Sequence, residues 1–226
     1  TVKFGNNVLI GKNVKIGKNS IIGANSILEH DVVVGDNCII GSNVVLKNSL
    51  LENNVDFVHI RKPNAQREQV ATLLNQIPNH LHPHLKLHYY EELVKQFPLV
   101  DFHHSSKTNF IKGLTKNQSK STHSLNALNS RSKYQYQFIS PVFDSLSKPG
   151  YSPNFSRDQL NEHLSTNSIT NAVALGGIKL ENVHLLKKVP LYGIALLGAI
   201  WREQPINQTQ YIEKIKQQLT WTDHTY

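Results

Sequence analysis

FGNNVLIGKNVKIG, residues 4–17, repeats one six-residue unit in direct succession. Glycine lies at positions 5, 11, 17, 23, 35 and 41, so the period of six is broken between these limits only at Glu29. An apolar residue, from Phe4 to Leu46, lies directly before each of eight positions spaced six apart, and Asn or Asp lies two residues after the first seven of these positions. A fixed internal period indicates stacked units with a shared core, and Gly and Asn tolerate the positive φ of tight corners. Residues 2–50 are therefore predicted to form a short stack of β coils with one inward apolar residue per unit.

A second pattern begins after Asn53, where apolar, β-prone stretches alternate with helix-like stretches. The expected strands are 56–60, 85–89, 100–104, 120–123, 134–142, 171–178 and 192–200, and the expected helices are 66–77, 90–97, 124–131, 156–164, 180–189 and 207–219. Such alternation favours parallel βα units. Seven strands are expected, whereas a closed (β/α) barrel has eight.

Several loops after the expected strands have phosphate-binding character. Gly176 and Gly177 follow one buried strand and Gly198 follows the next, and paired glycines let backbone amides approach an anion. Ser145, Ser147 and Lys148 add two hydroxyls and an ammonium in another loop. The formal net charge of +8 also favours anionic partners. Because no nucleic-acid signature occurs, we expect small phosphorylated substrates and no nucleic acid.

The repeat resembles the hexapeptide repeat of left-handed parallel β-helices, which many acyltransferases contain. In that family three hexads form one triangular coil and members often trimerise, so the resemblance implies a homo-oligomer formed through this segment. The stretch ILEHDVVVGDN, residues 27–37, resembles the "EHD…IGD" stretch of sugar acetyltransferases. That resemblance implies His30 as the general base of an alternative acyltransferase function.

Residues 54–219 resemble the thiamine phosphate synthase and thiazole tautomerase superfamily. Four motifs in the same order carry this resemblance: STHSL (121–125), ISPVFDSLSKPGY (139–151), VALGGIKLENV (173–183) and GIALLGAIW (193–201). It implies an α/β chain with a (β/α) barrel of TIM type over 54–226, without a recognisable first strand, behind a short left-handed β-helix over 1–53. The implied reaction joins hydroxymethylpyrimidine diphosphate to thiazole phosphate and releases pyrophosphate.

The resemblance also implies roles for individual residues. The loop with Ser145, Ser147 and Lys148 would hold the diphosphate together with Arg61, and Lys62 would assist from a position displaced by one residue. The loops with Gly176, Gly177 and Gly198 would hold the thiazole phosphate. His123 matches the acid/base histidine of the tautomerases, so tautomerisation through His123 is an alternative reaction, and a non-catalytic phosphate-binding or oligomerising module is another.

One departure from the synthases concerns their magnesium site. The resemblance implies Mg²⁺ as cofactor, but the places of its usual carboxylate ligands read Leu87-His88-Tyr89-Tyr90 and His103-His104-Ser105-Ser106. Magnesium prefers carboxylate and water oxygens over imidazole. A zinc interpretation of these histidines and of His80, His82 and His84 lacks a recognisable ligand spacing, so we assign no metal ligands from the sequence.

Cysteine content and hydropathy concern the cellular compartment. Cys38 is the one cysteine, which excludes an internal disulfide and a cysteine-rich zinc site. The sequence contains neither a signal-peptide pattern nor an apolar run of membrane length. We therefore expect a cytoplasmic location and no membrane partner.

Overall fold

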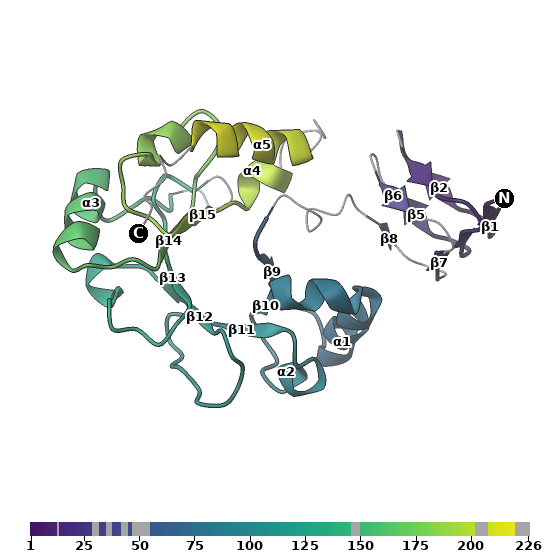
Figure 1. Cartoon of the computed structure of the whole chain (residues 1–226), viewed down its shortest axis with the longest axis horizontal. Helices are drawn as coiled ribbons and strands as arrows, with labels where there is room; N and C mark the ends of the chain where they lie inside the picture. Colours follow the sequence, from purple (N-terminus) through teal and green to yellow (C-terminus); the bar gives the residue numbers. More distant parts are fainter. Residues whose placement is uncertain are drawn as a thin grey trace. The chain divides into compact units, whose positions relative to one another are not determined.

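The computed structural model describes residues 1–12, 14–28, 32–34, 38–41, 45–46, 55–145, 150–201 and 208–219. The chain divides into two compact units, Thr1–Asn54 with Gln204–Ile212, and Val55–Glu203 with Glu213–Tyr226. Figure 1 shows both units with their helices and strands labelled.

The first unit is a short parallel β-helix. Its two-residue strands are β1 (Lys3–Phe4), β2 (Leu9–Ile10), β3 (Lys15–Ile16), β4 (Ile21–Ile22), β5 (Ile27–Leu28), β6 (Val33–Val34), β7 (Ile39–Ile40) and β8 (Val45–Leu46). They form three parallel sheets in the orders β1-β4-β7, β2-β5-β8 and β3-β6. Each residue pairs with the one 18 positions further on, as Lys3 does with Ile21. This register confirms that three hexads make one coil.

The corners of the coils depend on Asn and Gly as the repeat predicts. Asn7, Asn19 and Asn25 adopt φ values of 57°, 60° and 57°. A Cβ on Gly5 would lie 2.4 Å from the backbone nitrogen of Ala24 in the next coil, so only glycine fits there.

Among the described residues, the buried apolar side chains of the β-helix lie between Ile22 and Val34. Ile22, Leu28, Val32 and Val34 are buried and form one apolar cluster. Phe4 and Ile10, at the corresponding positions of the first coil, are 51% and 48% exposed. The first coil has a neighbouring coil on one side, so its side chains are covered less completely.

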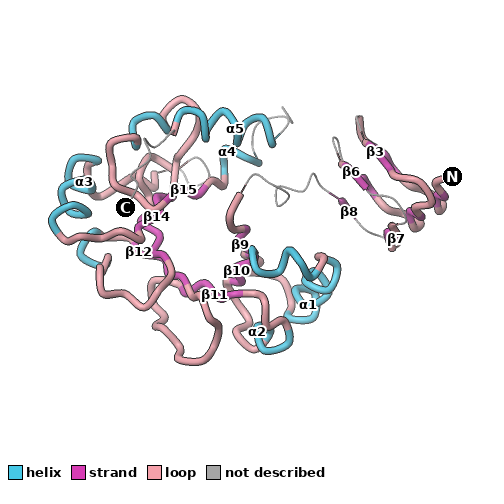
Figure 2. Tube along the Cα trace, in the orientation of Figure 1, coloured by secondary structure: helices cyan, strands magenta, loops and turns pink. Residues whose placement is uncertain are grey.

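The second unit is an open (β/α) barrel of TIM type. Its strands are β9 (Val58–Ile60), β10 (Leu85–Leu87), β11 (Asp101–His104), β12 (Ser119–Thr122), β13 (Tyr136–Ile139), β14 (Ala172–Leu175) and β15 (Gly193–Ala195). All six pairings are parallel, and the spatial order β15-β14-β13-β12-β11-β10-β9 follows the sequence. Figure 2 shows these strands running along an arc, with α1, α2 and α3 on its outer side. The seven strands of the sequence analysis are therefore confirmed.

Most helices after Asn54 are shorter than the sequence predicts, although α3 extends two residues beyond its predicted end. The helices are α1 (Arg67–Gln76), α2 (Leu93–Gln96), α3 (Arg157–Thr166), α4 (Gly198–Trp201) and α5 (Gln208–Gln218), with 3-10 turns η1 (Asn79–His84), η2 (Leu125–Ala127) and η3 (Val183–Leu186). The predicted helices 124–131 and 180–189 are reduced to the turns η2 and η3, and the predicted strand 192–200 ends at Ala195, before α4. No helix within the described ranges is long and apolar enough to cross a membrane.

Local sequence explains where the longer helices begin and which side they bury. The Ser156 hydroxyl accepts a hydrogen bond from the Gln159 amide at 3.1 Å, and the Gln159 side chain accepts one from the Ser156 amide at 2.7 Å. This reciprocal capping starts α3. Leu160 and Leu164 are four residues apart on one side of the helix, and both are buried.

Side chains of the barrel strands alternate between an inner and an outer face, as the period of two in a strand requires. Tyr136, Phe138 and Val173 form an inner apolar cluster with Phe57, Leu175 and Ala195. Polar side chains occupy the other inner positions of β9 to β12, which makes one half of the interior polar.

Candidate functional site at the carboxyl edge and in the barrel interior

The carboxyl ends of the parallel strands bring most predicted site residues to one edge of the sheet. In order along the sheet, Arg61 follows β9, His123 follows β12, Ser145 lies beyond β13, Gly176 and Gly177 follow β14, and Gly198 begins α4 after β15. Arg61 and Lys62 are exposed to solvent at this edge. The guanidinium of Arg61 lies 6.0 Å from the centre of the Tyr89 ring.

The two loops predicted to hold phosphate lie directly against each other. The amide of Val142 donates to the carbonyl of Leu175 at 3.0 Å, and the amide of Phe143 donates to that of Gly176 at 3.1 Å. Gly176 and Gly177 have φ values of 101° and 66°. A Cβ on Gly177 would lie 2.3 Å from the carbonyl oxygen of Asp144. Glycine is therefore required here both by the backbone conformation and by the close approach of the neighbouring loop.

The side chain of Asn182 forms hydrogen bonds to both ends of the turn that follows the paired glycines. The side chain of Asn182 donates to the carbonyl of Gly177 at 2.9 Å and accepts from the amide of Lys179 at 2.9 Å. The Gly176–Lys179 turn is thus fixed at both ends. A fixed turn keeps its backbone groups in place for a ligand.

His123 is held through one ring nitrogen. Its Nδ1 lies 3.1 Å from both the carbonyl oxygen and the hydroxyl of Ser140, and 3.2 Å from the hydroxyl of Tyr151. A carbonyl oxygen accepts only, so Nδ1 carries the proton of the neutral ring. That tautomer leaves a lone pair on Nε2, which can accept a proton from a substrate.

A pocket of about 300 Å³ lies beside His123. It is lined by Ser106, Lys120, Ser121, Thr122, His123, Ser124 and Ala127. Hydroxyls and one ammonium predominate in this lining, so the pocket is suited to a polar or anionic group.

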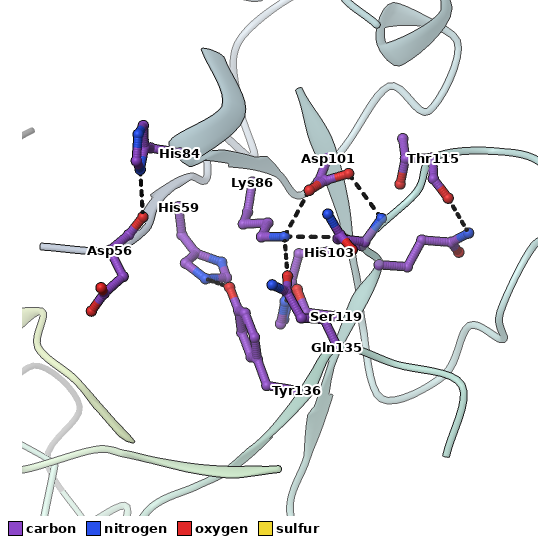
Figure 3. Close-up of polar contacts among 12 residues, drawn as sticks. Asp56, His59, His84, Lys86, Asp101, His103, Thr115, Ser119, Gln135 and Tyr136 are labelled. Carbon is purple, nitrogen blue, oxygen red and sulfur yellow. Dashed lines mark hydrogen bonds and ion pairs between the residues drawn. The ribbon is translucent and has the colours of Figure 1, made fainter. Parts of the chain in front are cut away.

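Inside the barrel, His59 and His88 make a direct contact. Nδ1 of His59 lies 2.9 Å from Nε2 of His88, and Nε2 of His59 lies 2.7 Å from the hydroxyl of Tyr136. Both ring nitrogens of His59 are therefore engaged. Figure 3 shows the His59 ring directed at Tyr136.

His103 completes this group from the next strand. Its Nδ1 lies 2.7 Å from the Ser119 hydroxyl and its Nε2 lies 2.8 Å from that of Ser121. Its ring centre is 4.8 Å from that of His59 and 4.3 Å from that of His88. We call His59, His88 and His103 the histidine triad.

A buried ion pair adjoins the triad (Figure 3). Lys86 is fully buried, and its ammonium donates to Asp101 at 2.9 Å, to the carbonyl of Asn117 at 2.9 Å and to the side chain of Gln135 at 2.7 Å. The second oxygen of Asp101 accepts from the amide of Asn117 at 3.1 Å. All three ammonium hydrogens thus have an acceptor, which a buried cation requires.

Burial keeps the triad neutral at pH 7. Burial, and then the charges of neighbouring groups, hold the pKa of His59 and of His103 well below the usual value of 6.5. The pKa of His88 is lowered to about 4, first by burial and then by Arg61. Burial also raises the pKa of Tyr136 well above its usual value of 10. The triad therefore consists of neutral imidazoles beside a protonated phenol.

These donors do not fit magnesium. His88 and His103 lie where the synthase resemblance implies oxygen ligands, and they offer imidazole nitrogen instead. Magnesium is bound by carboxylate, phosphate and water oxygens. Asp101, the carboxylate next to this region, is occupied by Lys86 and by the amide of Asn117.

His82 and His84 of η1 form hydrogen bonds to backbone carbonyls of neighbouring segments. Nε2 of His82 donates to the carbonyls of Leu74 and Ile77 at 3.1 and 3.0 Å, and Nδ1 of His84 donates to that of Asp56 at 3.0 Å. Among the residues that the structure describes, only the triad brings three possible metal ligands together.

Three predicted site residues, His30, Ser147 and Lys148, lie outside the described residues. Conversely, the sequence analysis did not identify His59, Lys86, Asp101 or Tyr136 as parts of a site. Their signal was a polar residue at every second position of otherwise apolar strands, as in VHI (58–60) and LKL (85–87). In a strand buried on both faces, such alternation indicates a polar interior.

Comparison with known proteins agrees with both halves of the chain. Residues 13–48 match the family model "Bacterial transferase hexapeptide (six repeats)". The crystal structure of thiamine phosphate pyrophosphorylase from Bacteroides thetaiotaomicron is similar with a TM-score of 0.63 and 24% identity, over 77% of this chain and 89% of that one. Thiamine phosphate pyrophosphorylase from Pyrococcus furiosus is similar with a TM-score of 0.61 and 15% identity, over 75% and 85%. No curated protein sequence matches the chain. At these identities the likeness shows a shared fold.

Proposed function

We propose that the second unit binds thiazole phosphate at the carboxyl edge of the barrel and joins it to hydroxymethylpyrimidine diphosphate. The observation that carries this proposal is the direct contact between the Gly176–Gly177 loop and the 141–145 loop. Two loops suited to phosphate lie side by side there, as a reaction between two phosphorylated substrates needs. The shared fold with thiamine phosphate pyrophosphorylases supports the choice of substrates.

The reaction requires stabilisation of a leaving group. A bond forms between the thiazole nitrogen and the methylene carbon of the pyrimidine, while the bond from that carbon to the diphosphate oxygen breaks. Pyrophosphate leaves with the electron pair, so negative charge develops on it. The guanidinium of Arg61 is suited to meet that charge with paired N–H donors. Ser145 adds a hydroxyl from the loop beyond β13.

The test combines the full chain with both substrates and measures thiamine phosphate by chromatography. We expect product formation, with kcat reduced at least about 10-fold in Arg61→Gln because a donor to the developing charge is lost. Arg157→Gln is the matched control, since Arg157 is an exposed arginine at the start of α3. Thiazole phosphate binding without any thiamine phosphate would refute the condensation and favour a non-catalytic binding module.

The geometry of His123 favours one second candidate, tautomerisation of a thiazole carboxylate phosphate. With Nδ1 fixed by Ser140, Nε2 could take a proton from one ring carbon and return it to the next position. Proton exchange in heavy water, followed by NMR, would detect this reaction. Loss of the exchange by about 100-fold or more in His123→Gln is expected, and an unchanged rate would exclude the role.

A further inference from the structure

The histidine triad is the strongest unassigned feature of the barrel. His59, His88 and His103 come from three neighbouring strands or strand ends, and one nitrogen of each lies within 4.8 Å of the others. None of the reactions proposed above uses them. A polar group placed in a barrel interior needs a physical explanation, because branched apolar side chains usually fill that space.

We propose that His59, His88 and His103 bind one divalent transition-metal ion, and that Zn²⁺ is the ion that this donor set fits best. Zinc accepts three imidazole nitrogens in a tetrahedral arrangement. At a Zn–N distance of about 2.0–2.1 Å, tetrahedral ligand atoms lie roughly 3.3 Å apart. The contact between His59 and His88 is 2.9 Å and the outer limit of the group is 4.8 Å, so small side-chain movements suffice.

The surroundings supply the outer hydrogen bonds that zinc-bound histidines usually have. A metal-bound imidazole directs its other N–H to an oxygen acceptor. When Nδ1 of His59 binds the metal, its Nε2–H can donate to the Tyr136 hydroxyl, which already lies at 2.7 Å. Either nitrogen of His103 can bind the metal while the other keeps its bond to Ser119 or Ser121.

The charges near the triad permit a dication. A metal binds neutral imidazole, and burial already keeps these rings neutral. Lys86 is the cation nearest in the interior network, and Asp101 compensates its charge at 2.9 Å. Arg61 also acts on His88, but it is exposed, so solvent weakens its repulsion.

Three protein ligands leave one coordination position. Within the described part of the chain, the metal-binding group contains no fourth His, Cys, Asp or Glu. Zinc sites with three protein ligands hold water or a substrate oxygen in the fourth position. We therefore assign an oxygen ligand, from water or from a bound anion, to that position.

The experiment titrates the chelator-stripped full chain with Co²⁺ and Zn²⁺. We expect one equivalent of Co²⁺ to give the intense visible absorption of a tetrahedral ion, and Zn²⁺ to displace it, with an excess of Mg²⁺ having no effect. His88→Gln should weaken Zn²⁺ binding at least about 100-fold, because loss of an outer partner alone costs 10–100-fold. Tyr136→Phe should weaken it about 10–100-fold.

Controls separate the triad from surface histidines. His80→Gln/His184→Gln removes two exposed imidazoles and should leave the affinity unchanged. Equal loss in this control, or full affinity in His88→Gln, would overturn the proposal. X-ray absorption of the Zn²⁺-loaded wild-type chain tests it without any variant: three imidazole ligands are expected, and fewer than three would also overturn it. None of these measurements depends on turnover, so their failure is distinct from failure of the proposed function.

Discussion

Replacement of Lys86 by methionine is the most direct test of the polar barrel interior. The Lys86 ammonium is fully buried, and its acceptors are Asp101, the carbonyl of Asn117 and the side chain of Gln135. Methionine retains much of the volume of lysine but leaves the carboxylate of Asp101, itself only 10% exposed, without its cation. Removal of one partner from a buried ion pair costs about 3–5 kcal/mol. That is a large share of the roughly 5–15 kcal/mol by which a domain is stable.

The assay is urea denaturation followed by tyrosine fluorescence. Residues 1–54 contain neither Tyr nor Trp, so this part of the chain contributes no signal. Lys179→Met is the matched control, because Lys179 and Glu181 form an exposed pair with a separation of 3.8 Å and side chains 41% and 61% exposed. An exposed pair contributes about 0–1 kcal/mol. If Lys86→Met lowers the free energy of unfolding no more than Lys179→Met does, the buried network does not stabilise the barrel.

Two further predictions concern the triad and the glycine loop. In chelator-treated protein, the free energy of unfolding should fall as the pH drops from 6.5 towards 4. In this range His88 binds a proton in the unfolded chain, where its pKa is about 6.5, but stays neutral in the folded chain, where burial lowers its pKa to about 4. Its contribution is about 3 kcal/mol, and urea titrations at several pH values should show a shallower fall in His88→Gln. Gly177→Ala should lower stability by about 1–3 kcal/mol, since it combines a φ of 66° with a contact to Asp144. Gly193→Ala, with no atom within 4 Å of the new Cβ, is its control in thermal unfolding, and equal midpoints would contradict the close approach.

The sequence predicted those features that depend on local periodicity. The hexad period predicts the stack of coils, and the resemblance to hexapeptide-repeat proteins, which implies three hexads per coil, predicts the 18-residue register. Most of the seven barrel strands were found because they are short apolar or β-prone runs between turn signals; β12 (SKST) is the most polar of them. The predicted helices 124–131 and 180–189 failed because their apolar residues, such as Leu128 and Val183, are buried by short turns. Tertiary packing outweighs helix propensity at such positions.

The carboxyl-edge site was accessible from the sequence for a related reason. In a parallel sheet, a residue just after any strand lies at the same edge, so His123, Gly176 and Gly198 could be grouped without knowledge of the strand order. The contact between the glycine loop and the 141–145 loop required one more fact, that β13 and β14 are neighbours. Sequential strands are usually neighbours in such folds.

The triad could not be found in the same way, because it depends on the level of each residue along its strand as well as on strand order. The parallel register pairs His59 with Lys86, so His59 lies level with the lysine and not with His88. Only the long imidazole side chains bring His59 and His88 into contact, across 29 positions of sequence. Lys86 and Asp101 are themselves paired in the register, and His88 and His103 each lie two residues further along. A period of two on β10 and β11 therefore places an ion pair at one level and imidazoles at the next. This layering explains why the same barrel half contains both: the ion pair compensates its own charge, and the imidazoles of His88 and His103 at the next level remain neutral.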